Sequence, residues 1–367
     1  MVNVNLSLIG RSDIMSDISV EEYEYYMKSR PHVVILGAGA SCAAIPNGDK
    51  NGKWISAMSG FINKLGLSDI IEKVSINTKS DNLEDIYMEL DERSATEIDC
   101  YNVKSKLETV IREYMSGFVL PDEPTIYDFL VISLTSKDLI ATFNWDPFLV
   151  QAIIRAQRYT DNIPKVAFLH GNVAVGYCEQ DNVIGNIGKL CKCGKPLSPM
   201  KLLFPVKKKD YTSDIAISEA WKLLKNMLKK AYMVTIFGYS APTSDAEAIE
   251  MLKQAWGAVY ERELEEIELI DIREESEVIK SWDQFIHTHH YSYHTSFFDS
   301  TLAKFPRRSC EATFDRLMNC RWLDDSKGFK DGMSFSEIDK KTYRLIEEEI
   351  INKGTKKYLT NPYLLDD

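Results

Sequence analysis

The chain has 367 residues, 44% of them hydrophobic, so it is long enough for one large domain or two and can bury a substantial core. Its 44 basic and 55 acidic residues give a net charge of −11, which argues against direct binding of nucleic acid. No apolar run approaches the roughly 18 residues of a membrane span, and the N-terminus lacks a signal-peptide pattern. We therefore expect a cytoplasmic protein that has no contact with membranes and keeps its seven cysteines reduced.

An N-terminal helical extension is predicted over residues 1–30. Ser19 and Glu22 have the spacing of a capping box, in which each side chain bonds to the backbone of the other residue. The helix that follows, over 21–30, ends at Pro31 because proline cannot continue a helix.

The most informative segment is an apolar strand over 33–36 that ends abruptly in the turn Gly37–Ser41. Continuous β-branched residues are typical of a strand buried in a parallel sheet. Glycines after such a strand let backbone N–H groups approach a pyrophosphate, and the next helix presents its positive N-terminus to it. Cys42 stands where a dinucleotide fingerprint has its third glycine, so the turn alone leaves nucleotide binding and a plain tight turn both open.

Helices and strands alternate along the chain up to about residue 275. A mainly helical segment over about 54–134 is interpreted as an insertion, because it is too long for one crossover between strands. Four further strands, each ending in small or polar residues, are predicted over 138–144, 165–171, 232–240 and 267–271. This alternation predicts an α/β fold with a Rossmann-like, doubly wound and mostly parallel sheet.

Two parts of the chain depart from this alternation. The segment 171–210 is loop-like and contains cysteines, which predicts a small loop or ribbon subdomain, and its run Lys207–Lys209 is interpreted as a solvated loop. Residues 276–367 form a C-terminal extension that is expected to pack on the core domain, 31–275. Within the extension, His287–His294 is interpreted as an aromatic strand or loop rather than a metal site, because no carboxylate cluster accompanies the histidines.

Small and polar residues stand at the ends of the predicted strands. Because parallel strands bring their carboxyl ends to one edge of the sheet, we expect these residues to meet there. They are Gly37, Gly39, Ser41, Asn144, Asp146, His170, Gly238, Ser240 and Asp271. Taken singly, Asn144 is explained as a helix cap, His170 as a structural histidine and Asp271 as a surface turn. Their joint occurrence favours a functional site.

This ordered set resembles the sirtuin family over roughly residues 31–275. Gly37–Ser41 matches the opening GAGxS of that family, Thr142–Asp146 its TxNxD motif, His170 with Gly171 its HG pair, and Gly238–Ser240 its later phosphate loop. The resemblance implies that NAD+ is the substrate and that the bond between its nicotinamide and ribose is cleaved. The missing third glycine argues against a dehydrogenase that transfers hydride.

The resemblance also implies a role for each site residue. Asn144 positions a water or the ribose hydroxyls, Asp146 engages the nicotinamide end of NAD+ or its ribose, and His170 is a general base in its neutral form. Asp271 accepts the hydroxyls of the adenosine ribose. The diphosphate is held by the two turns, through Gly37, Ala38, Gly39, Ser41, Gly238 and Ser240.

Two departures separate the chain from the sirtuins that deacylate peptides. Those sirtuins continue the first motif with Phe and Arg side chains at the nicotinamide end, whereas the segment 47–52 has neither. They also carry two CxxC pairs on a zinc ribbon, whereas this chain offers Cys178, Cys191 and Cys193 and leaves a fourth ligand unnamed. Bound zinc and a plain loop with reduced thiols both remain open.

The long insertion, the opening motif and the segment Pro124–Leu130 resemble the bacterial sirtuin-like proteins of anti-phage defence. The implied activity is that of an NAD+ glycohydrolase, which cleaves NAD+ to nicotinamide and ADP-ribose and depletes the infected cell. The alternatives are an NAD-dependent protein deacylase and a non-catalytic sensor of NAD or ADP-ribose that gates a partner. Control is expected from a homo-oligomer or a co-encoded partner such as an ATPase or nuclease, since the chain has no P-loop or nuclease motif.

Overall fold

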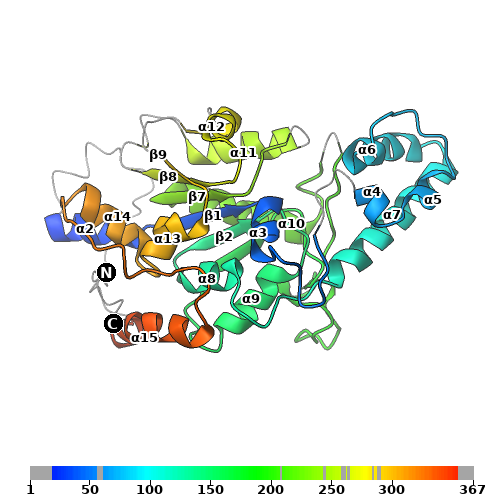
Figure 1. The fold of residues 1–367 in the computed structure, drawn as a ribbon. Coiled ribbons are helices and arrows are strands. Elements are labelled where there is room, and N and C mark those ends of the chain that lie inside the picture. The colour runs from blue at the N-terminus through cyan, green and yellow to red at the C-terminus, as the bar shows by residue number, and fades with distance from the viewer. Residues whose placement is uncertain are drawn as a thin grey trace.

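A computed structural model describes residues 19–55, 61–206, 209–242, 245–257, 262, 265–282, 285–286 and 291–353. Its centre is a six-stranded parallel sheet with the order β3-β2-β1-β7-β8-β9 (Figure 1). The strands are β1 (His32–Leu36), β2 (Leu139–Thr142), β3 (Lys165–Phe168), β7 (Met233–Phe237), β8 (Glu266–Ile270) and β9 (Tyr291–His294). This is the strand order of a doubly wound dinucleotide-binding fold, so the predicted α/β, Rossmann-like fold class is confirmed.

The strand order reverses between β1 and β7, at the centre of the sheet. Leu36, the last residue of β1, pairs with Thr142 on one side and with Phe237 on the other. Every residue of β1 and β7 is buried, as their continuous apolar sequences predict. In doubly wound folds, ligands bind outside the carboxyl ends of the strands at this reversal.

The helices around the sheet form two packing groups. Their bounds are α3 (Ala38–Ala44), α8 (Ile126–Ile132), α9 (Phe148–Ala156), α10 (Ile215–Lys230), α11 (Ala246–Trp256), α12 (Glu275–Trp282) and α13 (Thr301–Lys304). In the first group α8 contacts α3, α9 and α13, whereas in the second α10 contacts α11 and the strands β2 and β3. Although α8 lies within the range predicted as an insertion, it therefore packs with the core.

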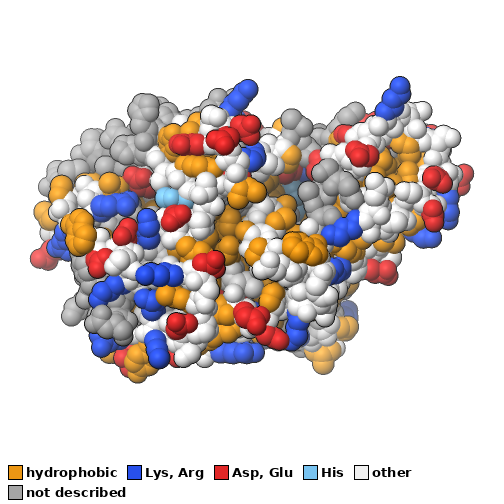
Figure 2. All heavy atoms as spheres, viewed as in Figure 1, with side chains coloured by type: hydrophobic (Ala, Val, Ile, Leu, Met, Phe, Trp, Pro, Cys, Tyr) orange, Lys and Arg blue, Asp and Glu red, His pale blue; other side chains and the backbone are white. Residues whose placement is uncertain are grey.

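The rest of the predicted insertion is a helical lobe that projects at one end of the molecule, as the ribbon (Figure 1) and the space-filling view (Figure 2) show. Its helices are α4 (Phe61–Lys64), α5 (Ser68–Ile71), α6 (Leu83–Ser94) and α7 (Ile98–Ser116). The long helix α7 contacts α5 and α6. Its buried residues recur every three or four positions, which gives the helix one apolar face: Cys100, Val103, Leu107, Ile111 and Met115.

The cysteine-containing segment folds as a small antiparallel sheet with the order β5-β4-β6. Its strands are β4 (Val175–Cys178), β5 (Val183–Asn186) and β6 (Ser198–Pro199). The region predicted as a loop or ribbon is thus a three-stranded antiparallel ribbon.

The two ends of the described chain meet beside the sheet. The helix α2 (Val20–Ser29) begins at the predicted capping box of Ser19 and Glu22 and packs against α14 (Ser309–Leu317). The C-terminal extension also supplies β9, the edge strand, followed by a 3-10 turn, η3 (Phe297–Asp299). His294 ends that strand, whereas His287, His289 and His290 lie outside the described residues. Within the described ranges, no helix combines the length and apolar character needed to cross a bilayer.

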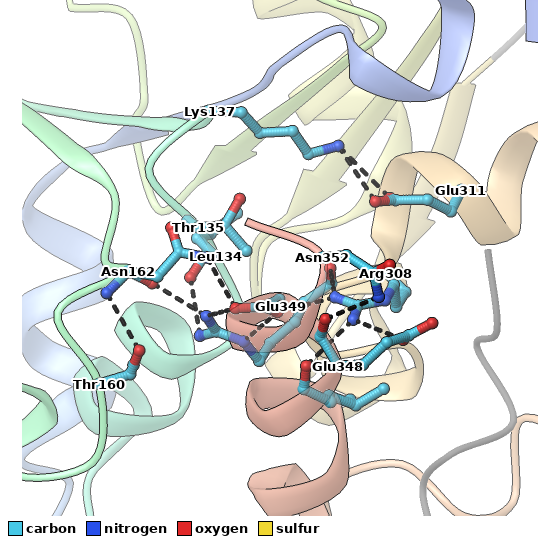
Figure 3. A network of polar contacts seen from close by, with 12 residues as sticks. Leu134, Thr135, Lys137, Thr160, Asn162, Arg308, Glu311, Glu348, Glu349 and Asn352 are labelled. Atoms are coloured by element: carbon cyan, nitrogen blue, oxygen red, sulfur yellow. Dashed lines mark hydrogen bonds and ion pairs between the residues drawn. The ribbon is translucent and has the colours of Figure 1, made fainter. Parts of the chain in front are cut away.

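A buried charged network joins the last helix, α15 (Phe335–Ile351), to the core (Figure 3). Glu349 accepts hydrogen bonds from Arg307 Nε at 2.7 Å, Arg308 Nη1 at 2.9 Å and Asn162 Nδ2 at 2.7 Å. Burial would raise the pKa of Glu349, but the two guanidinium groups outweigh burial and lower it. Because Arg307 also donates to the carbonyl of Ile132, the network ties α15 to the end of α8.

Replacing Glu349 with glutamine is expected to lower the free energy of unfolding by about 3–5 kcal/mol, because two buried guanidinium groups lose the carboxylate that they share. Chemical denaturation of the whole chain measures this change. Glu347→Gln is the matched control: Glu347 is exposed on the same helix, and its loss should cost less than about 0.5 kcal/mol. Equal losses in the two variants would contradict a stabilising role for the network.

Candidate active site

Two glycine turns touch each other at the reversal of the sheet. Gly37 N donates to Phe237 O at 3.0 Å, and Gly39 N donates to Gly238 O at 2.9 Å. A Cβ atom on Gly238 would lie 2.4 Å from Ala40 N, and the φ of Gly238, +60°, is one that L-residues rarely adopt. The glycines therefore allow direct contact between the backbones of the two turns. Since Gly39 is exposed on the outer side, the turn is open to a ligand there.

Asn144 lies directly beside the first turn. Its Nδ2 is 2.8 Å from Gly37 O and 2.9 Å from Ser41 Oγ, and Tyr127 OH lies 3.2 Å away. The interpretation of Asn144 as a helix cap is not supported, because α9 is capped by the carboxylate of Asp146, which accepts the first helical N–H. The amide side chain of Asn144 is instead fixed against the glycine turn.

Asp146 is a buried carboxylate that fixes the hydroxyl of Ser41. Its Oδ2 accepts a hydrogen bond from Ser41 Oγ at 2.6 Å, and its Oδ1 accepts one from Phe148 N at 3.2 Å. Burial raises the pKa of Asp146 to about 6, although these two hydrogen bonds act in the opposite direction. Both oxygens thus bond within the protein, and the predicted contact of Asp146 with the nicotinamide end stays a prediction.

His170 follows β3 and is 5% exposed. Its ring packs edge-on against Phe143, with centroids 4.8 Å apart, and Tyr211 lies on another side, with its OH 3.5 Å from His170 Nε2. Burial lowers the pKa of His170 to about 3, with Asp245 opposing the shift and Lys209 reinforcing it. The imidazole is therefore neutral near pH 7, as the assignment of a general base requires.

A buried carboxylate, Asp245, organises the surroundings of His170. Its Oδ1 pairs with Lys209 Nζ and lies 3.8 Å from His170 Nε2, and its Oδ2 accepts a hydrogen bond from Tyr239 OH at 2.7 Å. Tyr239 stacks on Phe143 with centroids 4.2 Å apart. Since the imidazole is neutral, Lys209 is the cation that compensates Asp245.

These contacts correct one expectation and add residues that the sequence did not indicate. The interpretation of Lys209 as a solvated residue is wrong: it is 6% exposed because Asp245 compensates its charge in the interior. Lys207 and Lys208 lie outside the described residues. No motif pointed to Asp245, whereas Tyr127 stands inside the segment Pro124–Leu130 and Tyr239 inside the glycine motif of the second turn, although neither was assigned to the site.

The remaining predicted binding residues stand at the same edge of the sheet. Asp271 follows β8, and its carboxylate is already engaged by Arg273, at 2.7 Å from Nη2 and 3.1 Å from Nε. Burial would raise the pKa of Asp271, but Arg273 outweighs burial and lowers it. A ribose hydroxyl would therefore share this carboxylate with a guanidinium group. Ala38 and Ser240 are exposed at their turns.

A cluster of three cysteines and one aspartate, all potential metal ligands, lies on the small sheet. The ligand atoms of Cys178, Asp181, Cys191 and Cys193 all lie within 4.8 Å of one another, and Cys191 Sγ is 2.8 Å from Asp181 Oδ2. Asp181 supplies the fourth potential donor that the cysteine spacing left unnamed. Three thiolates and one carboxylate are donors that tetrahedral zinc accepts, so the residues fit that ion.

The fold and site define a doubly wound α/β protein with a polar site at the carboxyl edge of its sheet. No known family description and no curated protein matches the chain. Among solved structures it is similar to Sir2 bound to an acetylated peptide, at 14% identity and a TM-score of 0.36 over 83% of this chain and 99% of that one. It is also similar to Sir2 with a p53 peptide and NAD+, at 14% identity and a TM-score of 0.33 over the same shares. Similarity at this level does not assign the chain to a family.

Replacing Gly238 with alanine is expected to lower the free energy of unfolding by more than about 3 kcal/mol, because strain at positive φ adds to a clash with the other turn. The control is Gly188→Ala, whose φ is +77° with nothing within 4 Å of the added Cβ, so only strain of about 1–2 kcal/mol applies. Denaturation curves of both variants measure the difference. Similar losses would show that the contact between the turns does not carry this stability.

Proposed function

We propose that the chain is an NAD+ glycohydrolase, which cleaves NAD+ to nicotinamide and ADP-ribose. The observation that carries this proposal is that the Asn144–Ser41 pair lies against the first of two touching glycine turns at the reversal of the sheet, while Phe143, the neighbour of Asn144 in the chain, packs on the neutral His170. Doubly wound folds bind dinucleotides at this place. The sirtuin-like motifs supply the same residues in the same order.

The reaction breaks the bond between ribose C1′ and the nicotinamide nitrogen. The bonding electron pair leaves with the ring, which becomes neutral nicotinamide, while positive charge develops on the ribose. A water then bonds to C1′ and gives up a proton, which His170 accepts as general base. Because Nδ2 of Asn144 is fixed by Gly37 O and Ser41 Oγ, its Oδ1 is left to accept a hydrogen bond from that water or from a ribose hydroxyl.

Hydrolysis is favoured over deacylation by the segment that follows the first turn. Asp49 is buried, and its carboxylate accepts hydrogen bonds from Asn51 N and Lys53 N at 2.8 Å and from Val119 N at 3.1 Å. The segment 47–52 is therefore a tight turn fastened to the end of the insertion, and it brings no Phe or Arg side chain to the site. Deacylation would instead yield O-acyl-ADP-ribose from an acylated peptide, and a sensor would bind NAD+ without turnover.

The cellular role that we propose is defence against phage by depletion of NAD+. Such an activity harms its own cell, so we propose control by self-assembly or by a co-encoded partner such as an ATPase or nuclease. Measuring mass and NAD+ consumption together tests this control, and a monomer that is fully active on its own would contradict it.

Incubation of the purified chain with NAD+ is expected to release nicotinamide and ADP-ribose. Liquid chromatography measures both products. Asn144→Ala and His170→Ala should each lower kcat by roughly 10²- to 10⁴-fold, because positioning and proton transfer are lost. Asn102→Ala, exposed on α7, is the control and should retain the wild-type rate. Unchanged turnover in both site variants, or no product in any assembly state of the folded protein, would contradict the proposal.

We also propose that the cysteine cluster holds zinc as a structural ion. Protein purified without chelators should contain about one zinc ion per chain by mass spectrometry of metals. Cys191→Ser and Asp181→Ala should lower that content, whereas Cys320→Ser, at an exposed cysteine outside the cluster, should not. Chelation should lower the unfolding temperature of the wild type. A metal-free protein whose unfolding temperature is unaffected by chelators would rule the site out.

A further inference from the structure

A cavity of about 710 Å³ lies between the helical lobe and the core. It is lined by α6, α7 and the segment that follows the small sheet and is open to solvent on one side, and its volume is typical of sites for small molecules. The lining residues that matter for its chemistry are Tyr87, Glu108, Arg112, Lys201, Phe204 and Lys209. None of the residues assigned to the glycine turns lines it.

Arg112 has an unpaired hydrogen-bond donor at this cavity. Its Nη2 donates to Met200 O at 2.9 Å, but its Nη1 is buried and has no partner among the described residues. Burial lowers the pKa of Arg112, with Glu108 opposing the shift. Glu108 does not satisfy the guanidinium group, because its Oε1 accepts a hydrogen bond from Tyr87 OH at 2.5 Å. A buried donor left unpaired is costly, so an acceptor from a ligand is the missing element.

Four cations and four acids line the cavity, so its charge is balanced overall but not pair by pair: Lys104, Arg112, Lys201 and Lys209 against Asp91, Glu108, Glu113 and Asp210. Lys104 pairs with Asp91 at 2.9 Å, and Asp210 accepts hydrogen bonds from the turn that follows it. Lys201 is exposed and, like Arg112, has no carboxylate partner in the described part of the chain. Glu113 and Asp210 are the exposed acids on the same lining. Two cations that form no ion pair with any described residue favour an anionic ligand at this place.

An aromatic wall runs from the cavity to the candidate active site. Phe204 stacks on Tyr87 with centroids 5.0 Å apart and an interplanar angle of 17°, and its centroid lies 4.9 Å from that of Trp145. Trp145 stands between Asn144 and Asp146 in the chain, and its Nε1 is a second buried donor for which the described residues offer no partner. A ligand with a flat, acceptor-rich ring matches these surfaces.

We propose that this cavity binds a nucleotide, with its phosphate on Arg112 and Lys201 and its base near the wall formed by Tyr87 and Phe204. Lys209 lines the cavity and also pairs with Asp245 beside His170, so a bound phosphate competes with Asp245 for that ammonium group. This gives the nucleotide a physical route to the active site. The ligand is additional to NAD+, and its binding does not depend on the proposed hydrolysis.

Calorimetric titration of the whole chain with AMP tests the site without any turnover of NAD+. AMP should bind, and Arg112→Gln should weaken its affinity at least about tenfold. Arg112→Lys should recover part of that loss, because it restores the charge but not the fork of donors. Lys106→Gln, an exposed cation on the same helix outside the cavity, is the control and should bind AMP as the wild type does. AMP held at the glycine turns would be indifferent to Arg112, and that result would overturn the proposal.

Three further ligands distinguish the chemistry of the site. Adenosine lacks the phosphate and ribose 5-phosphate lacks the base, so each should bind at least about tenfold more weakly than AMP. Succinate tests whether a carboxylate ligand is recognised equally well, and affinity equal to that of AMP would overturn the nucleotide assignment. If Arg112→Gln lowers the unfolding temperature, Lys201→Gln replaces it as the test, since Lys201 is exposed. If neither Arg112→Gln nor Lys201→Gln weakens the binding of AMP, the site is excluded.

Discussion

The contact between two glycine turns is the constraint on which the site depends. Because Gly39 N bonds to Gly238 O without intervening side chains, the carboxyl ends of β1 and β7 are held together at the reversal of the sheet. Asn144 then uses Gly37 O as an anchor, and Tyr239, next to Gly238, extends toward Asp245. A side chain at Gly37, Gly39 or Gly238 would separate these groups. Backbone contact between the two turns therefore fixes the positions that the side chains of the site occupy.

Two buried carboxylates give the site its electrostatic character, and each is compensated differently. Asp146 has only neutral donors, Ser41 Oγ and a backbone N–H, so burial dominates and its pKa rises to about 6. Asp245 has a cation, Lys209, together with the hydroxyl of Tyr239. Its negative charge is therefore balanced before it can draw a proton onto His170, whose own burial keeps the imidazole neutral. A weakly basic, neutral histidine next to a balanced ion pair is the result.

Much of the fold could be predicted from local patterns, whereas much of the site could not. Five strands of the main sheet were predictable as apolar runs that end in glycine, asparagine, histidine or aspartate, and their parallel arrangement follows from the alternation with helices. The sixth strand, β9, lies in a segment that the sequence left open between an aromatic strand and a loop. Lys209 precedes α10 in the chain and Asp245 follows it. Nothing in the sequence around either residue indicates that the two form an ion pair. Asp181 could not be predicted for a similar reason. The cysteine spacing suggests a metal site, but the sequence does not distinguish this exposed acid in a hairpin from other exposed acids. Local sequence predicts elements, and long-range pairing of charges completes the site.

The enclosure of His170 bears directly on how any base chemistry proceeds. Its ring is covered by Phe143 from the strand end and by Tyr211 from the loop that follows the small sheet, and its Nε2 faces Tyr211 and Asp245. A water or ribose hydroxyl must reach a ring nitrogen within about 2.6–3.2 Å to transfer its proton. Since the histidine is only 5% exposed, the segment that carries Lys209 and Tyr211 has to shift before a substrate reaches it. The ion pair of Lys209 with Asp245 resists that shift, so whatever weakens this pair also exposes the base.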